Sequence, residues 1–255
     1  MWRSIYKTRF CILNDTLAFE FLGEDGKLGY TYPVGKDPDA LAALMLRELG
    51  PVRFCLLTPD ECRELQARYP HATHAEFERD WVDYIYHAED MVSLVGRAFS
   101  GQRNHINKFK KLYPDHRFVE INHENLDDAV EFCRQYYSDN PPASDELIAE
   151  RDAIFELLEN FEAYAQIGGL LHNGERFVGI SIGEIVGDTL IIHTEKAYRS
   201  VEGSYPTLFN SFAKRFCTEG VRFINREEDC GQEGLRTSKL SYHPCLLLEK
   251  WSLTV

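Results

Sequence analysis

Polar side chains are densest in this sequence between Asn225 and Tyr242, directly after the stretch VRFINRE, which predicts a β-strand. A strand that continues into Asn-Arg-Glu-Glu-Asp is not optimised for a core, and the glycines that follow allow a tight turn into a helix. Arg226 and Arg236 can each bind a carboxylate or phosphate in bidentate fashion. The run therefore predicts a site, and its substrate-binding candidates are Asn225, Arg226, Glu227, Asp229, Arg236 and Lys239.

A second group of candidates lies at the end of a predicted strand, DTLIIHTEKA. Simple alternation along a strand places His193 and Glu195 on one face and Lys196 on the other. A carboxylate at this position could accept a proton from an attacking amine, so Glu195 is the candidate base. His193 and Lys196 are substrate-binding candidates.

Two further side chains could take part in proton transfer. Glu184 interrupts an otherwise apolar strand and is a second candidate base, and Tyr242, at the end of the last predicted helix, could protonate a leaving group. The alternative for Glu195 is a buried ion pair with Arg226 or Arg236. Glu184 could equally face solvent.

The formal net charge of −13 opposes general binding to polyanions. The segment from Arg97 to Arg117 is an exception, since it contains six Lys or Arg residues and one acid, Asp115. This segment predicts a local anion site, or else an ordinary solvated helix face. On the first interpretation, the candidates for contacting donor phosphates or a tRNA acceptor stem are Arg103, Asn104, Asn107 and Lys108.

The elements that must position these residues follow a definite order. After a helix predicted for residues 88–112, which two glycines could divide, come a strand, two helices, a three-strand meander, a helix, a strand, a helix and a final strand over 245–255. This is the order of GNAT-like acyltransferases, in which a gap between two neighbouring strands holds the acyl donor. Arg199 and Gly203 lie where such a fold places its phosphate loop, before a helix N-terminus, although a full glycine-rich pattern is missing.

The first third of the chain reads as a compact α/β unit, with strands predicted over 11–23 and 27–35 around the turn 24–27. The expected organisation is an N-terminal lobe over 1–87, a linking basic helix over 88–114 and a C-terminal lobe with the site over 115–255. No apolar run is long enough for a membrane helix, no signal peptide is evident, and the seven scattered cysteines suggest no disulfide scaffold or metal site. A cytoplasmic location is expected.

Three blocks resemble the soluble bacterial members of the phosphatidylglycerol lysyltransferase C-terminal domain family: WVDYIYHAEDMVSLVGRAFSGQRNHINKFKKLYP, SIGEIVGDTLIIHTEKAYRSVEGSYPTLFNSF and FINREEDCGQEGLRTSKLSYHP. The resemblance implies an α+β fold of two tandem GNAT-like lobes, with mixed central sheets flanked by helices. It also implies a relation to Fem-type transferases that use aminoacyl-tRNA.

The expected function is transfer of an aminoacyl group from aminoacyl-tRNA to a small amine or hydroxyl acceptor. The donor would be a co-substrate, and no cofactor or metal would be required. Two alternatives remain open: an N-acyltransferase that uses acyl-CoA, and a binding module that kept the fold without the reaction.

Overall fold

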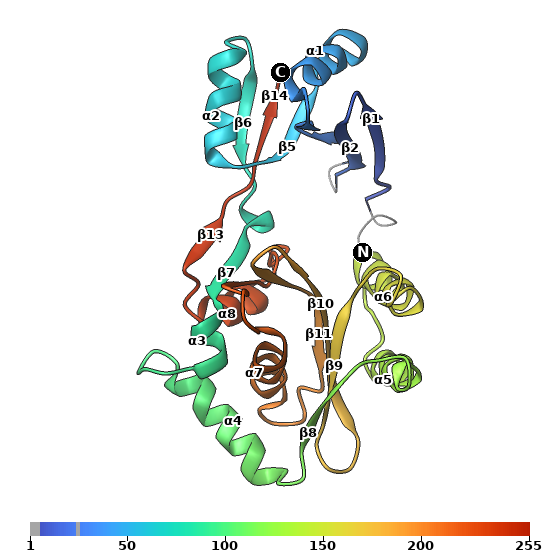
Figure 1. Cartoon of the computed structure of the whole chain (residues 1–255), viewed down its shortest axis with the longest axis vertical. Coiled ribbons are helices and arrows are strands. Elements are labelled where there is room, and N and C mark those ends of the chain that lie inside the picture. The colour runs from blue at the N-terminus through green and yellow to red at the C-terminus, as the bar shows by residue number, and fades with distance from the viewer. Residues whose placement is uncertain (1–5, 24–25) are drawn as a thin grey trace. The chain divides into compact units, whose positions relative to one another are not determined.

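A computed structural model of the chain describes residues 6–23 and 26–255, without the side chains of residues 73 and 74. The chain forms two compact units. The small unit contains residues up to 82 together with 248–255, and the large unit contains 83–247. Figure 1 shows the elements of each unit.

The small unit is a mixed sheet with two helices. Its strand order is β1-β2-β3-β5-β14-β6, with β4 paired to β2. The strands are β1 (Arg9–Leu13), β2 (Thr16–Leu22), β3 (Leu28–Thr31), β4 (Val34–Gly35), β5 (Arg53–Leu57), β6 (Thr73–Phe77) and β14 (Trp251–Thr254). The helices are α1 (Pro38–Leu49), α2 (Pro59–Arg68) and the 3₁₀ turn η1 (Arg79–Trp81).

The first predicted strand of the small unit is instead a hairpin. Asn14 and Asp15 both have positive φ, 49° and 58°, which is the backbone of a tight type I′ turn between β1 and β2. Asn and Asp tolerate this conformation better than other residues with a Cβ atom. The turn expected over 24–27 lies partly outside the described residues.

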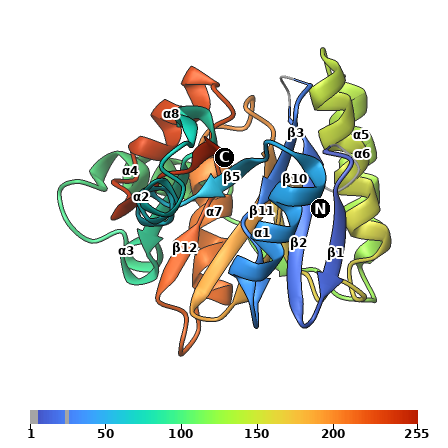
Figure 2. The same cartoon turned by 90° about the horizontal axis from the view of Figure 1, so that it is seen from above.

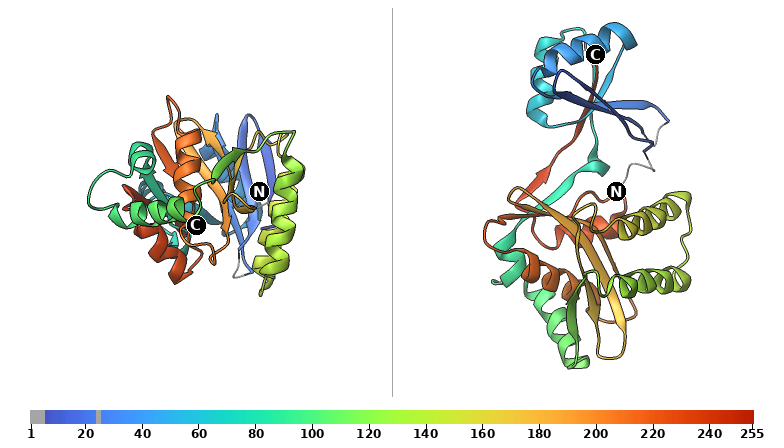
Figure 3. Two further views of the ribbon diagram at one scale, coloured as in Figure 1. Left: turned by 90° about the horizontal axis from the view of Figure 1, so that it is seen from below. Right: turned by 45° about the vertical axis from the view of Figure 1, so that its right-hand side comes forward.

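The large unit is built on a second mixed sheet, of order β13-β7-β12-β11-β10-β9-β8. Its strands are β7 (Asp83–His87), β8 (Arg117–Glu120), β9 (Ile167–His172), β10 (Phe177–Val186), β11 (Thr189–Ala197), β12 (Phe223–Asn225) and β13 (Leu246–Leu248). Its helices are α3 (Ala88–Ser93), α4 (Ser100–Leu112), α5 (Leu126–Asp139), α6 (Asp145–Glu159), α7 (Ser204–Phe216) and α8 (Glu233–Leu240). Within this unit, α7 lies on one face of the sheet, and α5 and α6 lie on the other (Figures 2 and 3).

The strand order confirms the expected gap between β11 and β12. These strands are parallel neighbours only where residues 189–191 of β11 pair with residues 223–225 of β12. Beyond this point β11 continues to Ala197, while the chain after Asn225 leaves the ladder. The second half of β11 therefore has a partner, β10, on one side only.

The two units divide the chain differently from the expected lobes. β7 pairs with β12, and Phe109 of α4 is fully buried in a core of the large unit, so the segment expected as a linker is part of that unit. The final stretch forms two strands, and β14 pairs with β5 and β6 of the small unit. Pairing between distant segments is set by tertiary structure, and local sequence does not report it.

The helix expected over 88–112 is two helices. α3 ends at Leu94, which has φ of 50°, and Gly96 has φ of 101°. The guanidinium of Arg103 donates hydrogen bonds to the carbonyls of Leu94 and Gly96 at this break. Arg103 therefore caps the backbone where the two helices separate.

Gly203 fixes how closely α4 packs against the start of α7. It has φ of 79°, and a Cβ atom at this position would lie 2.5 Å from the His105 carbonyl oxygen and 2.9 Å from Cβ of Phe109. A side chain at this position would therefore be destabilising for two reasons: the positive φ is unfavourable for a residue with a Cβ atom, and that atom would clash with α4.

We expect Gly203→Ala to lower the free energy of unfolding by about 2–4 kcal/mol, because the conformational cost and the contact with α4 add. The control is Gly187→Ala, since Gly187 has φ of 61° and open space around it, so only the conformational cost of about 1–2 kcal/mol applies. Urea unfolding measures both. Equal losses in the two variants would show that α4 does not restrict this position.

Candidate active site in the large unit

A buried ion pair occupies the gap between β11 and β12. Arg226, just after β12, donates from Nη2 and Nε to the same oxygen, Oε2 of Glu195 on β11, at 2.6 and 3.0 Å. The side chains of Arg226 and Glu195 are 8% and 10% exposed, so the pair is largely removed from water. The ion pair that was an alternative for Glu195 is therefore present, with Arg226 as the partner.

Aromatic rings cover the guanidinium of Arg226. Its central carbon lies 4.1 Å from the ring centre of Phe209, on α7, and 5.2 Å from that of Tyr242. The rings of Phe209 and Tyr242 meet edge to face at 5.1 Å. These contacts attract the cation and fix the plane of the guanidinium.

The ion pair leaves one polar atom free on each partner. Oε1 of Glu195 and Nη1 of Arg226 are buried and have no hydrogen-bond partner among the described residues. Most buried polar atoms in folded proteins are paired, so each of these two atoms retains hydrogen-bonding capacity that a water or a ligand could meet.

Tyr242 lies beside this pair, as expected for a residue of the same site. Burial raises the pKa of its hydroxyl, the charge of Arg226 lowers it and the charge of Glu195 raises it, so that the net pKa is about 12. The phenol therefore keeps its proton at neutral pH, which a general acid requires.

A β-bulge at His193 determines which face each residue of β11 presents. In the β10–β11 ladder Ile182 pairs with Thr194 and Gly183 pairs with Ile192, so His193 is an extra residue. The bulge interrupts simple alternation at His193, whereas Glu195 and Lys196 lie on opposite faces as expected. Glu195 bonds Arg226 on the α7 side, whereas Lys196 bonds Glu150 of α6 at 2.8 Å on the other.

His193 lies between two carboxylates. Its Nδ1 is 2.7 Å from Glu227, and its Nε2 is 3.3 Å from Glu184. Burial lowers the pKa of the imidazole, but the hydrogen bond and charge of Glu227 and the charge of Glu184 raise it more, so the net pKa is above the ordinary value. Glu184, the second candidate base, thus contacts His193.

The loop after β12 is held by α8. Lys239 is buried, and its ammonium donates to the carbonyls of Arg226, at 2.6 Å, of Glu227, at 3.1 Å, and of Glu228. Burial and the charge of Arg226 lower the pKa of Lys239 to about 8. Because these carbonyls satisfy the ammonium, Lys239 orders the backbone around Arg226 and Glu227.

Asp229 provides the second anchor of this loop. It is fully buried and accepts two hydrogen bonds from Arg236, at 2.8 and 2.9 Å, and one from the hydroxyl of Tyr84. Burial alone would raise the pKa of Asp229, but these bonds and the Gly231 N–H lower it to about 2. Arg226 and Arg236, expected as anion-binding residues, therefore each hold a carboxylate of the chain itself.

Asn225 completes this network. Its side chain donates to Asp83 at 3.1 Å and accepts from the Glu227 N–H at 2.7 Å. The latter bond supports Glu227, whose φ of 55° is unusual for a residue with a side chain. The residues expected around Asn225–Tyr242 are thus brought together, mostly by contacts with one another.

The candidates expected to contact donor phosphates fall into two groups: some are exposed to solvent, and others have structural contacts within the chain. Asn104, Asn107 and Lys108 are exposed on α4, opposite the buried Ile106 and Phe109, as the periodicity predicted. Lys108 pairs with Glu202, and Arg199 is exposed before α7. Arg103 and Gly203 have the structural contacts described above.

Three residues of the site had no signal in the sequence. They are Ser181, Tyr84 and Glu150, which belong to segments that read as an ordinary strand or helix. Tyr84 and Glu150 are revealed by their partners, and Ser181 by a buried hydroxyl without a hydrogen-bond partner among the described residues. Tyr84 and Glu150 come from elements far along the chain from β11 and β12, so no local pattern could have placed them there.

Comparison with known proteins places this geometry in a family. The model of the family described as phosphatidylglycerol lysyltransferase, C-terminal, matches residues 1–254. The chain belongs to this family. A curated relative, an uncharacterised protein of Mycoplasmoides gallisepticum, is 23% identical over 176 residues, which are 68% of this chain and 56% of that protein.

Solved structures agree with the fold. A conserved protein of unknown function from Bacteroides thetaiotaomicron is 33% identical, with a TM-score of 0.91 over all of this chain and 88% of that one. L-PGS from Bacillus licheniformis has a TM-score of 0.63 at 13% identity, over 96% of this chain and 83% of that one. FemX has a TM-score of 0.63 at 9% identity, over 98% and 89%. The family, and an α+β fold with two mixed sheets flanked by helices, are therefore confirmed as expected from the sequence.

Within the described part of the chain, no helix combines the length and apolar character needed to cross a bilayer.

The ion pair in the gap predicts a non-additive mutational cycle. We expect Arg226→Met and Glu195→Leu each to cost about 3–5 kcal/mol of unfolding free energy, because each leaves a buried charge unpaired. The double variant should cost clearly less than the sum. Urea unfolding of the four proteins measures the coupling.

The control cycle uses Arg134 and Glu131, an exposed pair 3.7 Å apart on α5, for which coupling of at most about 1 kcal/mol is expected. Additive losses at Arg226 and Glu195 would contradict the importance of their pairing.

His193 predicts a pH dependence of stability. Since its folded pKa is raised, its stabilising effect is complete below the unfolded pKa of about 6.5 and is lost as pH rises through the folded pKa. We expect unfolding free energy to fall less between pH 6 and 9 in His193→Gln than in the parent protein.

The matched control is His123→Gln, because His123 is exposed on the same unit. It should keep the parental pH dependence. An unchanged pH dependence in His193→Gln would refute the charged state of His193.

Proposed function

We propose that this protein transfers an aminoacyl group from an aminoacyl-tRNA to an amine or hydroxyl acceptor. In this reaction the acceptor attacks the ester carbonyl directly, the acceptor–acyl bond forms, and the bond between the acyl carbon and the ribose oxygen breaks. Oε1 of Glu195 accepts the proton of the nucleophile, and Tyr242 protonates the departing ribose oxygen. No covalent intermediate with the enzyme is required.

The observation that carries the choice of donor is the packing at the start of α7. A donor such as coenzyme A would place its diphosphate at this helix N-terminus. Here α4 covers Gly203 at a distance that excludes even a methyl group, and Lys108 pairs with Glu202 beside it. The Arg226–Glu195 pair also fills part of the gap in which a pantetheine arm would lie.

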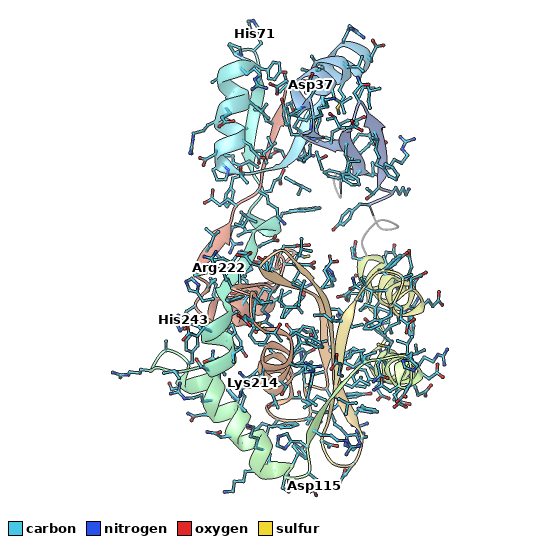
Figure 4. All side chains as sticks on the ribbon, in the orientation of Figure 1. Asp37, His71, Asp115, Lys214, Arg222 and His243 are labelled. Carbon is cyan, nitrogen blue, oxygen red and sulfur yellow. The ribbon has the colours of Figure 1, made fainter. Side chains whose placement is uncertain are left out.

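A cationic surface on α4 and α7 supports a polyanionic donor. Lys110 and Lys111 are exposed on α4, and Lys214, labelled in Figure 4, is exposed on α7. None of the three has a carboxylate partner among the described residues. Burial and then the charge of Lys110 lower the pKa of Lys214, so the two ammonium groups repel each other.

Such an arrangement is typical of a surface that an anionic partner completes. These neighbouring lysines occur in a chain whose net charge is −13. The phosphates of a tRNA acceptor stem would neutralise them and release counterions.

The test is binding and transfer with charged tRNAs at low salt. We expect Lys110→Glu with Lys214→Glu to weaken tRNA binding at least tenfold and to reduce the salt dependence of binding, because two phosphate contacts are lost. Filter binding over a range of salt concentrations measures both.

The control is Arg134→Glu, on α5 at the opposite face of the sheet, which should leave binding unchanged. Absence of tRNA binding by the parent protein at low salt would refute the tRNA donor. Thermal stabilisation by millimolar coenzyme A would favour acyl-CoA instead. Full biological activity of both Glu195→Gln and Tyr242→Phe would favour a binding module.

A further inference from the structure

A third unpaired polar atom lies beside the ion pair. The hydroxyl of Ser181 on β10 is completely buried and has no hydrogen-bond partner among the described residues. Ser181 pairs with Glu195 across the β10–β11 ladder. Side chains at directly paired positions point to the same face, with Cβ atoms about 4.5–5.5 Å apart.

Neighbouring residues establish which face this is. A Cβ atom on Gly179, two residues before Ser181, would touch Leu208 of α7 at 3.1 Å. The register is continuous from Gly179 to Ile182, so Ser181 faces α7 as well. Glu195 and Arg226 lie on the same side, against Phe209 of α7.

The three atoms have complementary hydrogen-bonding capacity. The Ser181 hydroxyl and Nη1 of Arg226 can donate, and Oε1 of Glu195 can accept. Because Glu195 already neutralises Arg226, a group that these atoms bind would be uncharged before reaction. A carbonyl oxygen beside an N–H or O–H group has these properties.

We propose that Ser181 and Arg226 together bind the carbonyl oxygen of the acyl ester, next to Glu195, and stabilise the negative charge that develops on it during attack. This assignment rests on the proposed function. As the nucleophile adds, the carbonyl π electrons move to this oxygen, and Glu195 takes the proton of the nucleophile. When the carbonyl re-forms, the ester C–O bond breaks and the ribose oxygen receives its proton. Donors buried beside an ion pair are fixed in advance, which makes such stabilisation effective.

Thr194 provides a matched control. Its hydroxyl is also buried and unpaired among the described residues. It is paired with Ile182 and therefore lies on the face of the sheet opposite to Ser181, where Lys196 bonds α6. Thr194→Val therefore removes a buried, unpaired hydroxyl as Ser181→Ala does, but on the face of the sheet away from α7.

The kinetic experiment compares single-turnover aminoacyl transfer in Ser181→Ala and Thr194→Val. We expect Ser181→Ala to lower the transfer rate at saturating donor by a factor of about 10²–10³, with donor affinity unchanged, because a donor to the transition state is lost. Thr194→Val should retain the parental rate. Urea unfolding should show that neither variant is destabilised, since neither hydroxyl has a partner to lose.

A structural experiment separates this proposal from the proposed function. Crystals of the parent protein soaked in acetamide should show its oxygen within hydrogen-bond distance of Ser181 and Arg226, and its nitrogen next to Glu195. Crystals of Ser181→Ala should not. Binding of acetamide in this manner without aminoacyl transfer would support the carbonyl site and refute the tRNA reaction. Parental transfer rates in Ser181→Ala, or acetamide absent from the parent site, would overturn the carbonyl site.

Discussion

The buried ion pair between Arg226 and Glu195 is the interaction on which the site depends. Two charges removed from water require good geometry and additional contacts. The rings of Phe209 and Tyr242 supply part of this environment. The pair exists only because β11 and β12 separate after three residues of pairing, which leaves room for both side chains between the strands.

The loop after β12 keeps Arg226 in place. A segment so rich in acids and glycines would not hold a single conformation by itself. Lys239 and Arg236, three residues apart and therefore on one side of α8, bind its backbone and its buried carboxylate. Two residues of this loop, Glu227 and Cys230, have left-handed backbone conformations. The density of polar residues between Asn225 and Tyr242 thus reflects both the chemistry of a site and the support that such a site requires.

The packing of α4 on α7 links the fold to the choice of donor. In a fold whose helix N-terminus is suited to phosphate binding, Gly203 instead allows a second helix to cover that terminus. The cations of α4 and α7 then lie on the outer surface, where they can meet a large anion. A glycine at this position could belong to a phosphate-binding loop or, as here, allow a second helix to pack closely. Only the residues around it distinguish these two roles.

The sequence by itself determined the family and the order of elements in the large unit, and it indicated where a candidate site lies. These follow from hydrophobic periodicity, turn residues and a long polar run, all of which are local properties of the chain. It also identified Glu195 with Arg226 as one possible ion pair, but could not choose between Arg226 and Arg236.

Only the tertiary structure decided the rest. The bulge at His193 changes which face Glu195 occupies, and it depends on the register with β10. β14 joins the sheet of the small unit because its partners lie almost 200 residues earlier, in a pairing that no local pattern reports. Ser181 reads as an ordinary strand residue until its hydroxyl is found buried and unpaired beside Glu195. Each of these features depends on contacts between segments that are distant in the chain. The sequence of either segment alone does not specify those contacts.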